Sequence, residues 1–191
     1  MDRSQFRANF GGRGPAVLPV IHVLDTKRTL ANIDILTDLG ARGCFLINHD
    51  FGVDAFLPIV EEVRDARRDL WIGLNFLAVT GRHAFPKLAE LAAKDCQIDA
   101  YWADDARIDE RSDVQTEAQA IDEARVGWSG LYFGGTAFKK QRPVAEKDYA
   151  RAAERATAWM DVVCTSGQAT GVEADDRKIA TFRVAVGDTP L

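Results

Sequence analysis

The fold is decided by two apolar stretches, Gly43-Cys-Phe-Leu-Ile-Asn48 and Leu70-Trp-Ile-Gly-Leu-Asn-Phe76, and by the pattern between them. Each stretch is apolar at nearly every position, which is typical of a strand covered on both faces in a parallel sheet. Between them, Phe56, Val60 and Val63 recur at helical spacing. A strand, a helix and a second strand in this order predict a right-handed crossover between neighbouring parallel strands.

The same unit recurs on both sides of this stretch. The first helix is expected to begin at Asp25 or Thr26, either of which can cap it. The last helix is expected to bury Ile179, Phe182 and Val186. The six expected strands cover residues 16–25, 43–48, 70–76, 98–103, 130–134 and 160–165, and each is followed by a helix.

Six strand-helix units predict an α/β fold of the parallel (β/α)8 TIM-barrel type. A closed barrel is favoured over an open doubly wound sheet because the strands are short and nearly all end in polar residues. A complete barrel has eight units and about 250 residues, whereas this chain has 191 and ends in what looks like the start of a seventh strand, residues 189–191. We therefore expect residues 1–191 to form a single barrel domain, truncated at the C-terminus after about six units, with residues 1–15 as a flexible segment or a short helix. The alternative is that another subunit supplies the missing surface, and a mass measurement on the native protein would test both.

Composition narrows the class of partner. The net charge is −5, so no basic surface for nucleic acid is expected. No run approaches the roughly 18 apolar residues of a membrane-spanning helix, and the N-terminus has no hydrophobic signal core. Cys44, Cys96 and Cys164 lie in or beside apolar runs and are expected to be buried free thiols. A cytoplasmic protein that binds neither nucleic acid nor membrane is therefore expected, and a homo-oligomer is favoured.

Polar residues recur near the ends of the predicted strands. In a barrel the carboxyl ends of all strands meet at one mouth, where barrel enzymes carry their chemistry. A core that buried these residues without partners would lose about 1–3 kcal/mol for each. By strand alternation, we expect convergence at the mouth of His22, Asn48, Asn75, Asp104 and Thr165.

The pair Asp104-Asp105, with Arg107 beside it, is the most pointed local feature. One carboxylate could act as a general base or bind a hydroxyl, with its pKa tuned by Arg107 or by its neighbour. The alternative is a solvated loop that caps a helix, because the residues that follow are strongly charged.

Metal binding is the less favoured alternative. His22 and Asp25 end the first strand, and His49 and Asp50 follow the second. Such side chains can hold a divalent metal ion. No His-x-His or HExxH spacing occurs, however, so no cofactor is expected.

Two loops could bind an anion. In Gly134-Gly-Thr-Ala-Phe-Lys-Lys140, paired glycines let the backbone approach a ligand, and Lys139 or Lys140 could meet its charge. The loop Thr165-Ser-Gly-Gln-Ala-Thr-Gly171 offers hydroxyl groups and glycine amides before a helix. A plain turn with surface lysines and simple loop closure with capping are the respective alternatives.

Several of these segments together resemble the BtpA-like family. The segments are Pro19-Val-Ile-His22, Asn48, Asn75, Asp104-Asp105, and the loop 165–171 leading to Gly187-Asp-Thr-Pro190. The family consists of TIM barrels named for a photosystem I biogenesis factor and is similar to ribulose-phosphate-binding barrels. The resemblance implies a phosphorylated small-molecule ligand, with the phosphate at the loops after strands seven and eight. Residues 48–51 and 134–138 depart from the family pattern.

Three functions are compatible with these observations. The first is an enzyme that acts on a phosphorylated sugar, nucleotide or similar metabolite by acid-base chemistry. The second is a phosphoribosyltransferase or nucleoside-processing enzyme, and the third is a non-catalytic assembly factor. The enzyme hypotheses predict catalytic roles for Asp104, Asp105 and His22, and substrate-binding roles for Asn48, Asn75, Arg107, Lys139, Thr165, Ser166 and Gly167.

Overall fold

The protein forms a six-stranded, fully parallel sheet whose strands follow the chain order β1-β2-β3-β4-β5-β6. A computed structural model describes residues 1–12, 14–139 and 141–191. The strands are β1 (Val20–Val23), β2 (Gly43–Asn48), β3 (Trp71–Asn75), β4 (Ala100–Ala103), β5 (Leu131–Gly135) and β6 (Val162–Cys164).

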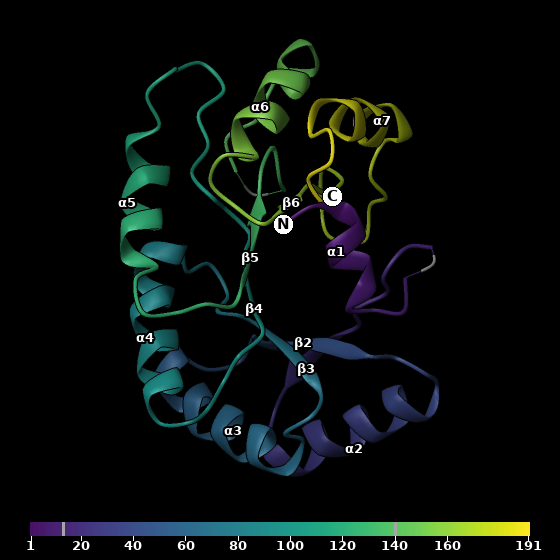
Figure 1. The fold of residues 1–191 in the computed structure, drawn as a ribbon, viewed down its shortest axis with the longest axis vertical. Coiled ribbons are helices and arrows are strands. Elements are labelled where there is room, and N and C mark those ends of the chain that lie inside the picture. The colour runs from purple at the N-terminus through teal and green to yellow at the C-terminus, as the bar shows by residue number, and fades with distance from the viewer. Residues whose placement is uncertain (13, 140) are drawn as a thin grey trace.

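Each strand is followed by a helix, and these helices form an outer layer around the curved sheet (Figure 1). The arrangement confirms the predicted α/β fold of the (β/α)-barrel type with six strand-helix units. The helices are α1 (Arg3–Ala8), α2 (Thr26–Asp38), α3 (Val53–Ala66), α4 (Gly81–Ala93), α5 (Thr116–Ala124), α6 (Tyr149–Ala156) and α7 (Asp176–Ala185), with a 3-10 turn η1 (Glu146–Asp148) before α6.

The ends of the expected elements differ from the structure for local reasons. The first strand was expected over residues 16–25, but β1 has only four residues. Its end is set by Asp25, whose carboxylate accepts a hydrogen bond from the Arg28 amide and so begins α2. Residues 189–191 form no strand, although the Val163 amide donates to the Pro190 carbonyl at 3.0 Å.

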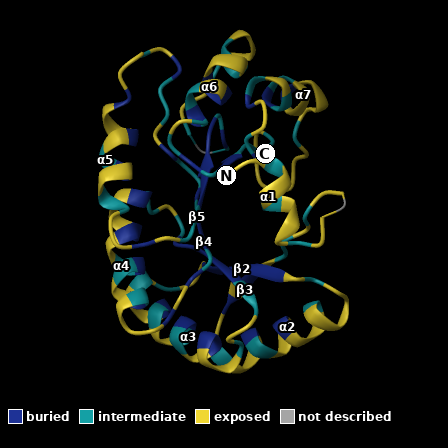
Figure 2. Ribbon diagram, in the orientation of Figure 1, coloured by how far each residue is buried: buried dark blue, intermediate teal, exposed yellow. Residues whose placement is uncertain are grey.

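The two faces of the sheet are packed differently. On the helix-facing side, Ile72, Leu74 and Phe76 belong to a large continuous core. On the inner side, a smaller cluster is built around Phe45 and Phe133. Figure 2 shows the buried strands between the partly exposed helices. This two-faced burial follows from alternation of side chains along each strand.

Helix α1 covers part of the inner face. Phe6 packs edge-on against Phe133 with ring centroids 5.9 Å apart, and Phe10 packs against Trp71 at 5.2 Å. The Arg3 amide also donates to the Asp188 carbonyl. In Figure 1, α1 lies between α2 and α7, on the side of the molecule where β1 and β6 do not meet.

The buried face of α7 differs from the expected one. Lys178 and Phe182 are its buried residues, whereas Ile179 is 37% exposed. The expectation for Ile179 was wrong because the buried stripe runs through Lys178, Phe182 and Val186, each four residues apart. In the described ranges, no helix combines the length and apolar character that a membrane crossing requires.

Candidate functional site at the carboxyl ends of the strands

The clearest polar contact at the carboxyl ends of the strands joins Asn75 and Asp104. The Asn75 Nδ2 group donates to Asp104 Oδ1 at 3.1 Å. Asn75 is 1% exposed, and its Oδ1 has no hydrogen-bond partner among the described residues. The indole Nε1 of Trp102 is also buried without a partner in that part of the chain. Buried polar atoms normally have partners, so these two unpaired atoms are unusual.

The backbone around Asp104 is held by the neighbouring strand. Gln141 Nε2 donates to the carbonyls of Asp104 and Gly135. A Cβ atom at Gly135 would lie 2.0 Å from the Asp104 carbonyl oxygen, so only glycine permits this approach. Asp104 therefore occupies a position defined by two strands and one loop.

Asp105 and Arg107 form a local turn. The Asp105 carboxylate accepts from the Arg107 amide at 2.8 Å and lies 3.3 Å from Arg107 Nε. Arg107 has a φ of 60°, which the carboxylate helps to hold. Both side chains therefore already have partners within this loop, and their predicted roles toward a ligand remain predictions.

His22 and Asn48 have other contacts. The His22 ring stacks on the His49 ring, with centroids 4.3 Å apart and an interplanar angle of 11°. Asn48 Nδ2 donates to the Phe51 carbonyl, and its Oδ1 accepts from the Leu77 amide. Asn48 thus ties together the loops that follow β2 and β3.

Of the five residues expected to converge at the mouth, only some are in contact. The structure shows a direct contact between Asn75 and Asp104, and it shows His22, Asn48 and Thr165 bonded or stacked elsewhere. Within residues 1–12, 14–139 and 141–191, no three His, Cys, Asp or Glu side chains are grouped to hold a metal ion.

The loops after β5 and β6 are bonded to each other. The Lys139 amide donates to Ser166 Oγ at 2.8 Å, and Thr165 Oγ1 lies 3.4 Å from the Ala137 carbonyl. A Cβ atom at Gly167 would lie 2.2 Å from the Val172 carbonyl oxygen, which explains the glycine by close backbone approach. Lys140 lies outside the described residues.

Lys178 is a candidate that sequence reasoning missed. Its residue is 8% exposed, and its Nζ donates to the carbonyls of Ala137 at 2.6 Å and Ser166 at 2.8 Å. Burial lowers the pKa of Lys178 from its ordinary value. The signal was present in the sequence, because Lys178 shares the helical stripe of Phe182 and Val186.

A cavity of about 370 Å³ adjoins Lys178 and the loop after β5. Its wall includes apolar and aromatic side chains as well as cationic ones. The residues that line this cavity include Phe138, Lys139, Gln141, Arg142, Tyr149 and Lys178.

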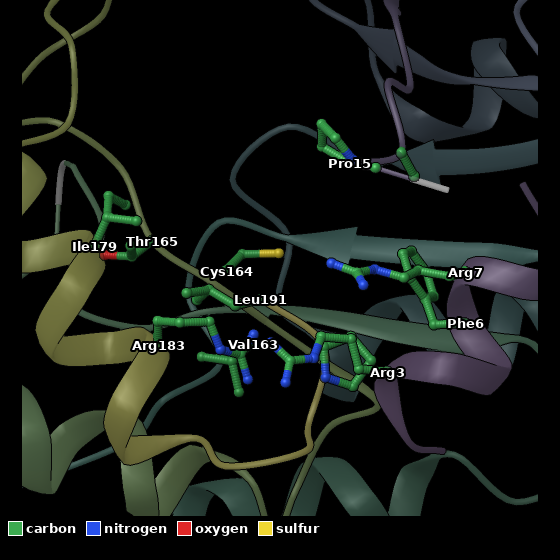
Figure 3. A pocket seen from close by; sticks show the side chains of 13 residues that line it. Arg3, Phe6, Arg7, Pro15, Val163, Cys164, Thr165, Ile179, Arg183 and Leu191 are labelled. Carbon is green, nitrogen blue, oxygen red and sulfur yellow. The ribbon is translucent and has the colours of Figure 1, made fainter. Parts of the chain in front are cut away.

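A second cavity of about 530 Å³ lies beside α1, and no described residue lines both this cavity and the one beside Lys178. Figure 3 shows the side chains of Arg3, Arg7 and Arg183 extending toward the same space. No carboxylate of the described residues lies within ion-pair distance of these three. Burial, and then repulsion from Arg3 and Arg7, lowers the pKa of Arg183. Thr165 lines this cavity and not the one beside Lys178.

Together, the parallel strand order, the outer helices and the polar side chains at the strand ends define the class of protein as a (β/α)-barrel-type α/β protein.

Solved structures of this class match the chain. An enolase from Bradyrhizobium complexed with magnesium and mandelic acid has a TM-score of 0.58 at 14% identity, covering 81% of this chain and 39% of its own. A mandelate racemase/muconate lactonizing protein from Herpetosiphon aurantiacus has a TM-score of 0.58 at 12% identity, with 90% and 45% coverage. The 3,6-anhydro-D-galactonate cycloisomerase from Zobellia galactanivorans has a TM-score of 0.57 at 12% identity, with 96% and 55% coverage.

These likenesses establish the fold, and the chain spans 39–55% of the length of the three proteins. No protein-family model and no curated protein matches the sequence. The expected membership of the BtpA-like family is wrong, since the structural neighbours are proteins of the enolase superfamily type. The motifs that suggested the family are short and come from strand ends and loops.

Proposed function

We propose that the protein is an enzyme that moves a proton on a phosphorylated small molecule, with Asp104 as the general base. The observation that carries the proposal is the Asn75–Asp104 hydrogen bond at the carboxyl ends of β3 and β4, where Asn75 Oδ1 has no hydrogen-bond partner among the described residues. Carboxylates positioned by a fixed donor are common general bases. The structural neighbours include proteins named as a racemase, a dipeptide epimerase and a cycloisomerase, which is in keeping with such chemistry.

The chemistry assigns a separate task to each side chain. Asn75 Nδ2 holds Asp104 Oδ1, so the carboxylate has a fixed orientation and can accept a proton from a substrate carbon or hydroxyl group. Asn75 Oδ1 can accept a hydrogen bond from a substrate hydroxyl group, and Trp102 Nε1 can donate one. Asn75 and Trp102 are therefore substrate-binding residues in this proposal, and Asn75 also orients Asp104.

The only indication of magnesium comes from the structurally similar proteins. Two of them are described as complexed with magnesium. The described residues here contain no three-member group of His, Cys, Asp or Glu side chains suited to a metal ion. We therefore assign no step to a metal.

A reducing compartment such as the cytoplasm also fits the thiols. Cys44, Cys96 and Cys164 are free, and the first two are buried. Burial raises the pKa of Cys44 to about 12 and that of Cys96 to about 11. Thiols in this state are weak nucleophiles and do not oxidise readily.

Asp104→Asn tests the catalytic role. Phosphosugars and nucleotides are first screened by thermal shift against the wild type. Ligands that stabilise it are then incubated with protein in D₂O, and exchange of carbon-bound protons is followed by NMR. We expect the rate of proton exchange in the variant to be about 10²- to 10⁴-fold lower than in the wild type, because a positioned base contributes that much to the rate.

The matched control is Asp122→Asn, an exposed residue on α5. This variant should exchange protons at the wild-type rate. Equal exchange by Asp104→Asn and the wild type would exclude Asp104 as the base. Absence of any stabilising phosphorylated ligand would count against the substrate class.

A further inference from the structure

The buried ammonium group of Lys178 has no acidic partner among the described residues. Its two hydrogen bonds go to the neutral carbonyls of Ala137 and Ser166. The rings of Tyr149 and Phe182 lie 5.1 and 5.9 Å from Nζ, which adds a weak attraction to the charge. A buried charge without a counter-ion is unfavourable, so a group that balances it is expected at this place.

Lys178 still has a free donor. An ammonium group has three N–H bonds, and the protein carbonyls accept two of them. Lys178 also lines the 370 Å³ cavity, so a ligand there can reach the third.

The cavity favours an anion. No Asp or Glu is among the residues that line it in the described part of the chain, whereas Lys139, Arg142 and Lys178 are. The Arg142 guanidinium is already balanced by Glu110, at 2.9 Å. Lys178 and Lys139 are therefore the charges left for a ligand.

Two residues that line the cavity contact residues of the proposed reaction centre. Gln141 lines it and donates to the Asp104 carbonyl. Phe138 lines it as well, and its ring lies 6.0 Å from that of Trp102. An anionic group in this cavity can thus belong to a molecule whose other end reaches Asp104.

We infer that this cavity is the phosphate subsite of the protein and that Lys178 is its main charged ligand. The assignment to the substrate of Asp104 rests on the proposed function, whereas phosphate binding itself does not. The phosphate subsite also changes the role that the sequence predicted for Ser166. The Ser166 hydroxyl accepts from the Lys139 backbone amide and its carbonyl accepts from Lys178 Nζ, so Ser166 positions the Lys139 loop and the Lys178 ammonium group.

Inorganic phosphate is the probe. Its affinity is measured by isothermal titration calorimetry for the wild type, Lys178→Met and Arg7→Gln, at constant ionic strength. Methionine keeps most of the side-chain volume and removes the charge. We expect phosphate to bind the wild type, to bind Lys178→Met at least 10-fold more weakly, and to bind Arg7→Gln unchanged.

Arg7→Gln is the decisive control because the cavity with Arg3, Arg7 and Arg183 is the rival anion site. Binding that is lost in Arg7→Gln and kept in Lys178→Met would place the phosphate beside α1 and overturn the inference. Failure of the wild type to bind millimolar phosphate would overturn it as well. Asp104→Asn should bind phosphate normally, so a failed catalytic proposal is distinguishable from a failed subsite.

A second measurement needs no variant. Lysines of the wild type are acetylated with and without phosphate, and the rate at each lysine is read by peptide mass spectrometry. Phosphate should slow acetylation of Lys178 and leave that of the exposed Lys27 unchanged. An unchanged rate at Lys178 would contradict the subsite, whether or not Lys178→Met folds.

Discussion

At the scale of single residues, a buried carboxylate supports the cavity beside Lys178. Glu110 is 2% exposed, and both of its oxygens accept from the two terminal nitrogens of Arg142. The hydrogen bonds from Arg142 are the main reason that the pKa of Glu110 is lowered. Such a carboxylate stabilises the fold above its unfolded-state pKa of about 4.3, and this contribution is lost as the pH falls through the lower folded-state value.

Glu110→Gln should therefore reduce the free energy of unfolding at pH 7 by about 1–3 kcal/mol, because Arg142 loses its charged partner. The difference from the wild type should shrink as the pH falls from about 5 toward the lowered folded-state pKa. Urea unfolding between pH 3 and pH 7 measures both effects. Glu90→Gln, on an exposed position of α4, should behave like the wild type throughout. A difference that does not depend on pH would show that the charge of Glu110 is unimportant.

At the scale of elements, two similar clamps join helices to strands. Asp99 Oδ2, just before β4, accepts from the Ile72 amide of β3 at 2.8 Å and from Arg64 of α3 at 2.7 Å. Two strands later, Asp161 Oδ2 accepts from the Tyr132 amide of β5 and from Arg125, which follows α5. In both clamps one carboxylate satisfies a strand amide and an arginine together.

Asp99→Ala should lower the free energy of unfolding by about 1–3 kcal/mol, since it leaves the Ile72 amide and buried Arg64 without this acceptor. Asp69→Ala removes an exposed carboxylate and serves as the control. Denaturant unfolding of both variants at pH 7 makes the comparison. If the two curves coincide, the clamp contributes nothing measurable.

At the scale of the whole molecule, α1 protects the inner face of an open sheet. Phe6 of this helix contacts Phe133, and Phe10, just after the helix, contacts Trp71. The same helix brings Arg3 and Arg7 close to Arg183, which places three positive charges around one cavity. The docking of α1 therefore depends on aromatic packing that outweighs this repulsion.

Phe6→Ala should lower the free energy of unfolding by about 1–3 kcal/mol, less than for a fully buried phenylalanine because Phe6 is half-buried. It should also increase binding of the dye ANS, since the inner apolar cluster becomes accessible. Leu39→Ala removes an 80% exposed apolar side chain and should change neither quantity. Unchanged dye binding in Phe6→Ala would show that α1 does not cover the inner face.

Local patterns were sufficient for the architecture. The alternation and helical spacing of apolar residues predicted six strand-helix units and a cap at Asp25 or Thr26, of which the structure has Asp25, bonded to an amide three residues away. The same patterns placed Asn75 and Asp104 at strand ends on a common face. These features depend on residues close together in the chain, which is why the sequence by itself determined them.

Contacts between distant loops were decided only by the tertiary structure. The sequence placed Asn48 among ligand-binding residues, whereas the fold uses both ends of its amide to join two loops. It treated Lys139 and Ser166 as separate anion ligands, whereas the fold bonds one to the other and buries Lys178 beside them. The physical reason is that a polar side chain takes whichever partners the packed chain brings within about 3 Å, and no local pattern specifies those partners.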